Sequence, residues 1–168
     1  MTLYVEETLA VTVSADSVWN VLKDFSSVQN YSMGVKSTQI LEGPTSGLGC
    51  RRRCHFYDKT SVIEEITQYQ EGESFRIKLS EYSLPMQSLE AFLRVVPNGV
   101  GQSKVSMGID YLPKGGAIGR LLGQYLMKPM LRKMLRKNLL GLAYYAKTKK
   151  VIVDQLPNAN ELKSTIGI

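Results

Sequence analysis

Histidine and cysteine are scarce in this 168-residue chain, which contains one histidine and two cysteines. Two cysteines cannot form a disulfide framework, so we expect both thiols to be reduced. The sequence also lacks a metal-ligand spacing, a phosphate-binding loop and a nucleophile motif, and it therefore predicts no metal site and no cofactor. No apolar run approaches the roughly 18 to 20 residues of a membrane-spanning helix, and the N-terminus lacks a signal-peptide pattern. We expect a cytoplasmic protein with a single globular domain.

Acidic residues are absent from positions 111–153, where ten of the chain's 21 basic residues lie. The other eleven basic residues are outnumbered by the fifteen acidic residues, so the net charge of +6 comes from this one segment. Such a segment is typical of a solvated helix face, and also of a surface that meets a polyanion or an anionic membrane.

Alternation of apolar and polar residues predicts seven short strands, at 2–13, 35–43, 49–57, 60–70, 73–81, 87–97 and 102–112. Helical spacing follows the first strand over 14–25, with Ser14 or Asp16 as the candidate N-cap, and a further helical turn covers 26–32. The spacing becomes helical again for about thirty residues after the last strand.

This order of elements predicts an α+β fold in which a curved antiparallel sheet packs around a long C-terminal helix. Residues 1–150 form the predicted domain, and residues 151–168 are an extension for which the sequence predicts no definite structure. A sheet curved around a helix can leave an internal cavity, which is a common place for an apolar ligand.

The segment GLGCRRRCHFY at 47–57 holds both cysteines and the only histidine. In a strand, alternation places Cys50, Arg52, Cys54 and Phe56 on one face, and Arg51, Arg53, His55 and Tyr57 on the other. The two cysteines would then lie roughly 13 Å apart with the histidine pointing away, which excludes a shared metal ion or disulfide. The solvent-facing arginines have no aromatic stacking partners, so we expect no specific binding of nucleic acid.

Arg52 shares its face with apolar residues, and a buried arginine requires a partner. The next strand offers Glu64 and Glu65. A three-residue turn would place Glu64 opposite Arg52, whereas a tighter turn would place Glu65 there. The pair is either a structural ion pair that holds the strand register or a polar group that binds one end of an apolar ligand.

Over roughly residues 3–148 the chain resembles the polyketide cyclase/dehydrase branch of the START-like (SRPBCC) superfamily. The resemblance rests on VSADSVWNVLKDFSSVQNY, GLGCRRR, SVIEEITQYQ, ESFRIKLSEYSLPMQSLEAFLRV and YLPKGGAIGRLLGQYL. It implies the helix-grip fold, with seven antiparallel strands and a deep apolar cavity beneath the terminal helix. It also implies that Arg52 and Glu64 match recurring residues of the family and form a pair in that cavity. Because Tyr31-Ser32-Met33 and Leu89 depart from the family pattern, the resemblance does not identify the ligand.

The leading hypothesis is a carrier or binding protein for a small hydrophobic molecule, such as a lipid, a sterol or a polyketide. The candidate ligand-binding residues are those that alternation, helical spacing and the resemblance place toward the interior: Arg52, Glu64, Tyr31, Cys54, Phe56, Phe75, Ile77, Leu89, Leu93, Met107, Tyr111 and Leu135. The alternatives are a cyclase or dehydratase with Glu64 as general base, and an interaction module that binds polyanions or membranes through the basic helix.

Two apolar stripes on the C-terminal helical segment point in different directions. One stripe includes Leu131, Met134, Leu135, Leu139, Leu142, Tyr145 and Ala146, and we expect it to face the sheet. The other, at Ile118, Leu121, Leu122, Tyr125 and Leu126, is rotated by more than a third of a turn. Either Pro129 kinks the helix or the upstream part is a separate flap. The basic and apolar groups of residues 114–137 also suggest transient contact with an anionic membrane.

Overall fold

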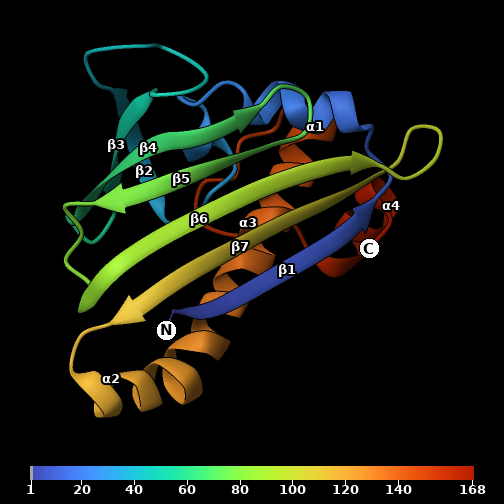
Figure 1. Ribbon diagram of the computed structural model, residues 1–168. Helices are drawn as coiled ribbons and strands as arrows, with labels where there is room; N and C mark the ends of the chain where they lie inside the picture. Colours follow the sequence, from blue (N-terminus) through green and yellow to red (C-terminus); the bar gives the residue numbers. More distant parts are fainter. Residues whose placement is uncertain (1) are drawn as a thin grey trace.

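A computed structural model describes residues 2–168, which form a curved seven-stranded antiparallel sheet, a long helix beneath it and several shorter helices (Figure 1). The strand order across the sheet is β1-β7-β6-β5-β4-β3-β2. The strands are β1 (Leu3–Val11), β2 (Val35–Ile40), β3 (Arg51–Phe56), β4 (Ser61–Gln70), β5 (Ser74–Ser80), β6 (Met86–Pro97) and β7 (Ser103–Pro113). The predicted α+β helix-grip architecture is therefore confirmed.

Two short helical elements, α1 (Ala15–Leu22) and η1 (Val28–Asn30), connect β1 to β2. Helix α1 begins where Ser14 acts as the N-cap, because its hydroxyl accepts the backbone N–H of Ser17 at 3.2 Å. Its buried face presents Trp19 to the sheet interior. The helix thereby closes one end of the space between the sheet and the long helix.

The long helix α3 (Lys128–Thr148) crosses the inner face of the sheet and packs mainly on β1 and β7 (Figure 1). Leu131, Leu135, Leu139 and Leu142 are buried, as the sequence predicts. The prediction is wrong for Met134, which lies on the solvent side of the stripe and is exposed.

Two further elements, α2 (Gly116–Leu122) and η2 (Gly123–Met127), precede α3 without a break. Element η2 is one π-helical turn, in which the Lys128 N–H bonds to the Gly123 carbonyl five residues earlier. Pro129 lies in the first turn of α3, directly after the π-helical turn, and it has no backbone N–H to donate to the preceding turn. The change between the two apolar stripes thus coincides with the π-helical turn. No helix within residues 2–168 has both the length and the apolar character needed to cross a bilayer.

The last helix, α4 (Ala159–Ile166), lies in the segment for which the sequence predicts no definite structure. Ile166 is buried, and its carbonyl accepts the backbone N–H of Thr12 at 3.0 Å. The Tyr144 hydroxyl of α3 donates to Glu161 of α4 at 2.5 Å. These contacts pack the C-terminal segment against the start of α1 and the end of α3.

Candidate ligand-binding site

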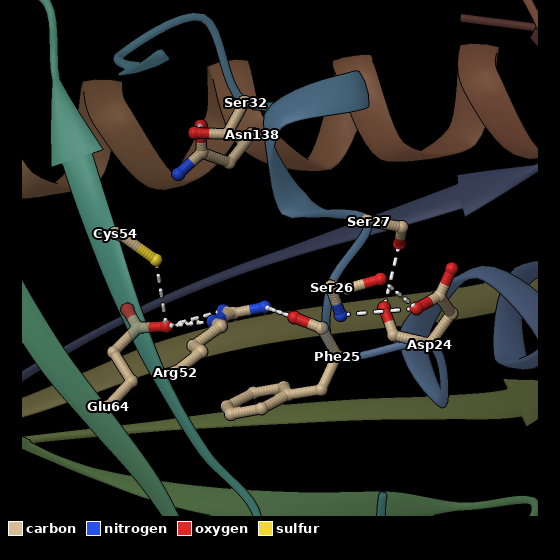
Figure 2. Close-up of polar contacts among 9 residues, drawn as sticks. All are labelled: Asp24, Phe25, Ser26, Ser27, Ser32, Arg52, Cys54, Glu64 and Asn138. Carbon is tan, nitrogen blue, oxygen red and sulfur yellow. Dashed lines mark hydrogen bonds and ion pairs between the residues drawn. The ribbon is translucent and has the colours of Figure 1, made fainter. Parts of the chain in front are cut away.

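Arg52 and Glu64 face each other on neighbouring strands β3 and β4 and form a buried ion pair (Figure 2). The Nε of Arg52 donates to Oε2 of Glu64 at 2.5 Å, and its Nη2 contacts the same oxygen. The neighbouring glutamate, Glu65, points to the other face and pairs with Arg51 at 3.8 Å. Of the two turn lengths that the sequence left open, the structure has the three-residue turn, closed by the Phe56 N–H and the Thr60 carbonyl at 2.9 Å, and this turn selects Glu64 over Glu65.

Arg52 extends from β3 toward the segment that follows α1 (Figure 2). Its Nη1 donates to the carbonyl oxygen of Phe25 at 2.7 Å, and its guanidinium lies 3.8 Å from the centre of the Phe25 ring. The Arg52 side chain is thus satisfied by protein groups on three sides, and the residue is only 5% exposed. Glu64 is different, because within residues 2–168 no group donates a hydrogen bond to its second oxygen, Oε1.

Burial sets the protonation of the groups around this pair. Burial and the neighbouring Glu64 carboxylate, which accepts a hydrogen bond from Cys54 Sγ at 3.7 Å, together raise the pKa of the Cys54 thiol to about 12. Burial also raises the pKa of Tyr31 to about 12, although Arg52 partly offsets the effect. Burial by itself lowers the pKa of Arg52, but the Glu64 carboxylate outweighs it and raises the pKa above its ordinary value. At neutral pH the site therefore holds a charged arginine, a neutral thiol and a neutral phenol.

Apolar rows adjoin the ion pair on the inner face of the sheet. The strand register places Leu79 of β5 opposite Glu64, and the next row runs through Ile66, Ile77, Ala91 and Ile109. Leu79 and Ala91 face inward but are only partly buried. Solvent therefore reaches part of this apolar wall, beside Glu64 in the strand register.

The structure distributes the predicted site residues over the interior. Leu89, Leu93, Met107 and Leu135 are buried on the inner face of the sheet or on α3, and Phe56 is partly buried at the end of β3.

Phe75 and Tyr111 lie in different surroundings. Phe75 packs edge-on against Trp19 and Phe25, with ring centroids 6.1 Å apart in each case, and so belongs to an aromatic cluster below α1. Tyr111 donates its hydroxyl to the Gly123 carbonyl at 2.9 Å and holds the π-helical turn. The binding role of all these residues remains a prediction.

Two surface hollows accompany the interior, and neither is lined by Arg52 or Glu64. The larger, of about 540 Å³, lies over the sheet and includes Tyr4, Arg76 and Phe92. The smaller, of about 330 Å³, lies between α3 and the segment before β2, and we call it the Met33 hollow. Its lining comprises Met33, Gly34, Met130, Lys133, Met134, Lys137 and Asn138.

The Tyr31-Ser32-Met33 segment connects the ion pair to the Met33 hollow. Tyr31 is buried and interacts with Arg52 and Glu64, whereas Met33 lines the hollow. Between them, the Ser32 hydroxyl donates to Oδ1 of Asn138 on α3 at 3.1 Å (Figure 2). Sequence patterns do not reveal Asn138 as a partner of Ser32 or Phe25 as a partner of Arg52, because both contacts join segments far apart in the chain.

Comparisons with known proteins agree with this architecture. The family model described as polyketide cyclase/dehydrase and lipid transport matches residues 2–147. The Zhui aromatase/cyclase from Streptomyces sp. R1128 is similar in structure, with a TM-score of 0.68 and 17% identity over 89% of this chain and 96% of that chain. Truncated norcoclaurine synthase from Thalictrum flavum has a TM-score of 0.68 and 14% identity over 88% of this chain and 95% of that chain. No curated protein matches the chain by sequence.

Proposed function

The chain belongs to the polyketide cyclase/dehydrase and lipid-transport family, and from this membership we propose that it binds or carries a small hydrophobic molecule between the sheet and α3. The fold is typical of proteins that bind hydrophobic ligands. We place the ligand beside the Arg52–Glu64 pair, with Glu64 as its polar contact. The ligand would be a lipid, a sterol or a polyketide-like molecule with at least one hydroxyl or protonated carboxyl group.

The observation that carries the proposal is the unused Oε1 of Glu64 beside an apolar wall. The Glu64 side chain is 13% exposed, so Oε1 reaches solvent, and a ligand hydroxyl that donates to it would take the place of water. Arg52 meanwhile donates to Oε2 of Glu64, which leaves Oε1 as the acceptor for the ligand. Leu79 and Ala91 supply the adjoining apolar contact for the rest of the ligand.

The proposed access route is the Met33 hollow. Methionine side chains are flexible and polarisable, so Met33, Met130 and Met134 can rearrange around a passing apolar ligand. Behind them, the Ser32–Asn138 hydrogen bond joins the segment after η1 to this part of α3. Breaking one such hydrogen bond costs about 1 kcal/mol, so this bond alone does not hold the route closed.

The test combines native mass spectrometry with a binding assay. The purified protein should carry a co-purified hydrophobic molecule, and a fluorescent fatty acid should bind to the emptied protein. The variant Arg52→Met/Glu64→Leu, which keeps the interior apolar, should weaken binding at least about tenfold by removing a charged hydrogen-bond acceptor. The matched control is Arg51→Met/Glu65→Leu, which removes the exposed neighbouring pair. Equal binding by both variants, or no binding by the wild type, would contradict the proposal.

A second candidate function is catalysis of cyclisation or dehydration, favoured by the structural similarity to an aromatase/cyclase. The same unused Oε1 of Glu64 could then accept a proton from a bound substrate. The two functions are distinguished by Glu64→Gln, which abolishes turnover of a polyketide-like substrate if the protein is an enzyme. Without turnover by the wild type, the catalytic candidate fails and the binding proposal stands alone.

A further inference from the structure

The helical run before and into α3 exposes a continuous apolar surface. It is formed by Ile118, Leu121, Leu122, Tyr125, Leu126, Met130 and Met134, each between 42% and 75% exposed. We call this surface the apolar ridge. In Figure 1, α2 lies past the end of β7, at the opposite end of the molecule from α1 and α4. We propose that the apolar ridge docks on the surface of an anionic membrane.

Glycine contacts hold the ridge outward. A side chain at Gly119 would place its Cβ 1.8 Å from the Lys114 carbonyl oxygen, and one at Gly123 would lie 2.6 Å from Pro113 Cγ. The helix therefore packs on the protein through its smallest residues, at closest approach. If the large apolar side chains turned inward, they would not fit in this close contact and would push the helix away from the protein. The packing at the glycines therefore keeps these side chains exposed.

The π-helical turn keeps the ridge continuous from α2 into α3. In a regular helix, residues four apart drift by about 40° per step, and the series Ile118, Leu122, Leu126, Met130 and Met134 would wind around the axis. The extra residue of η2 rotates the later side chains back by about 100° around the helix axis. Met130 and Met134 consequently continue the exposed line, which ends at the Met33 hollow.

The charge around the ridge has one sign. Lys114, Lys133 and Lys137 are exposed, and among residues 2–168 no acidic side chain pairs with them. Arg132 and Arg136, by contrast, point to Glu7 of β1, at 3.1 and 3.8 Å. No acidic residue occurs between positions 111 and 153, so an anionic surface that meets the ridge encounters no repelling group from this segment.

A lipid surface fits both features at once. Protruding leucine, isoleucine and tyrosine side chains enter the boundary between headgroups and acyl chains, while flanking lysines contact the anionic headgroups. The proposal does not depend on the ion pair, because among residues 2–168 the partners of Arg52 and Glu64 include no ridge residue. Met130 and Met134, which also line the Met33 hollow, are left unchanged in the vesicle-binding variants below.

Vesicle flotation tests the proposal with the full chain. Vesicles of phosphatidylcholine with about 30% phosphatidylserine should carry the protein upward, whereas pure phosphatidylcholine should carry far less. The variant Leu121→Glu/Leu126→Glu should reduce partitioning at least about tenfold, since it places charges in the inserted face. Its control is Val100→Glu/Val153→Glu, which changes two exposed apolar residues away from the ridge.

The contribution of charge is tested separately. Each lysine near an anionic surface contributes about fivefold, so Lys114→Glu should reduce partitioning by at least about fivefold. Lys104→Glu, on the outer face of the sheet, is the matched control. Fluorescent fatty-acid binding by all four variants should equal that of the wild type, which separates this proposal from the ligand site.

Three outcomes would overturn the proposal. They are absence of binding to acidic vesicles, equal loss in test and control variants, and a concentration-dependent dimer that Leu121→Glu/Leu126→Glu disperses. The last result, from light scattering after gel filtration, would assign the ridge to a second copy of the chain. Emission from Tyr125→Trp that brominated acyl chains quench would instead support insertion directly.

Discussion

The guanidinium of Arg52 lies between two partners from different elements, with the Glu64 carboxylate on β4 and the Phe25 carbonyl after α1. It therefore links the sheet to the segment that closes one end of the interior. Among residues 2–168 no group donates to the second carboxylate oxygen of Glu64, and the proposed ligand binding uses that oxygen.

The Arg52–Glu64 pair predicts a strong asymmetry in stability. Glu64→Gln should lower the free energy of unfolding by about 3 to 5 kcal/mol, because it leaves the Arg52 charge buried and uncompensated. Arg52→Met/Glu64→Leu should return to within about 1 kcal/mol of the wild type, since neither charge remains. Urea denaturation measures both values, and a single variant as stable as the double variant would disagree.

Gly141 predicts an overpacking effect on α3. A Cβ at Gly141 would lie 2.1 Å from the carbonyl oxygen of Tyr31, so Gly141→Ala must push α3 away from the segment after η1. We expect a loss of about 1 to 3 kcal/mol in the free energy of unfolding. The control is Gly34→Ala, whose Cβ would meet only an ordinary contact of 3.9 Å with Phe56. Similar stability of the two variants in thermal unfolding would exclude this packing role.

Cys54 predicts a fall in stability at alkaline pH. Burial, together with Glu64, raises the pKa of its thiol from 9.0 to about 12, so the folded state keeps a proton that the unfolded chain releases. The stabilisation is complete below pH 9 and disappears as the pH rises toward 12, by about 1.4 kcal/mol per pH unit. Urea midpoints between pH 8 and 11 should fall less steeply for Cys54→Ala. Parallel curves for the two proteins would be the contrary result.

Met134 predicts a kinetic effect on ligand exchange. It lines the Met33 hollow and does not contact the ion pair, so Met134→Trp should narrow the route without changing the bound state. Stopped-flow fluorescence should show association and dissociation slowed by a similar factor, with an unchanged equilibrium constant. The exposed, distant Val151→Trp provides the control for added aromatic bulk. A changed affinity with unchanged rates would place the route elsewhere.

Ile166 predicts that the C-terminal segment stabilises the domain. Its side chain is fully buried, and Ile166→Ala should cost about 2 to 5 kcal/mol in the free energy of unfolding. Val153→Ala, at an exposed position in the same segment, should change stability by less than about 0.5 kcal/mol. Equal effects in chemical denaturation would show that α4 contributes little.

The sequence predicted those features that depend on near neighbours. Alternation along 49–57 placed Arg52 and Cys54 on the inner face, and it offered Glu64 and Glu65 as partners of Arg52, of which the structure selects Glu64. Ser14 was one of two N-cap candidates, with Asp16, and the local hydrogen bond to Ser17 identifies it as the cap.

Features that depend on distant segments were beyond reach. The Phe25 carbonyl has no sequence signature, and α4 is a short helix held by contacts with Thr12 and Tyr144. Met134 was placed inside because its spacing fits the buried stripe, yet the width of that stripe is set by how closely α3 approaches β1 and β7. The only sign of the π-helical turn in the sequence was the different direction of the two apolar stripes.

The five residues of η2 divide the terminal helix into two parts that differ in how they pack on the protein. Downstream of η2, the inward-facing side chains of α3 are buried, so their size and apolar character are restricted by the residues they pack against. Upstream of η2, the glycines make the close contacts with the rest of the protein, and the large apolar side chains are exposed. Substitutions of the exposed side chains upstream of η2 can therefore alter the protein surface without disturbing the packing of α3 against the sheet.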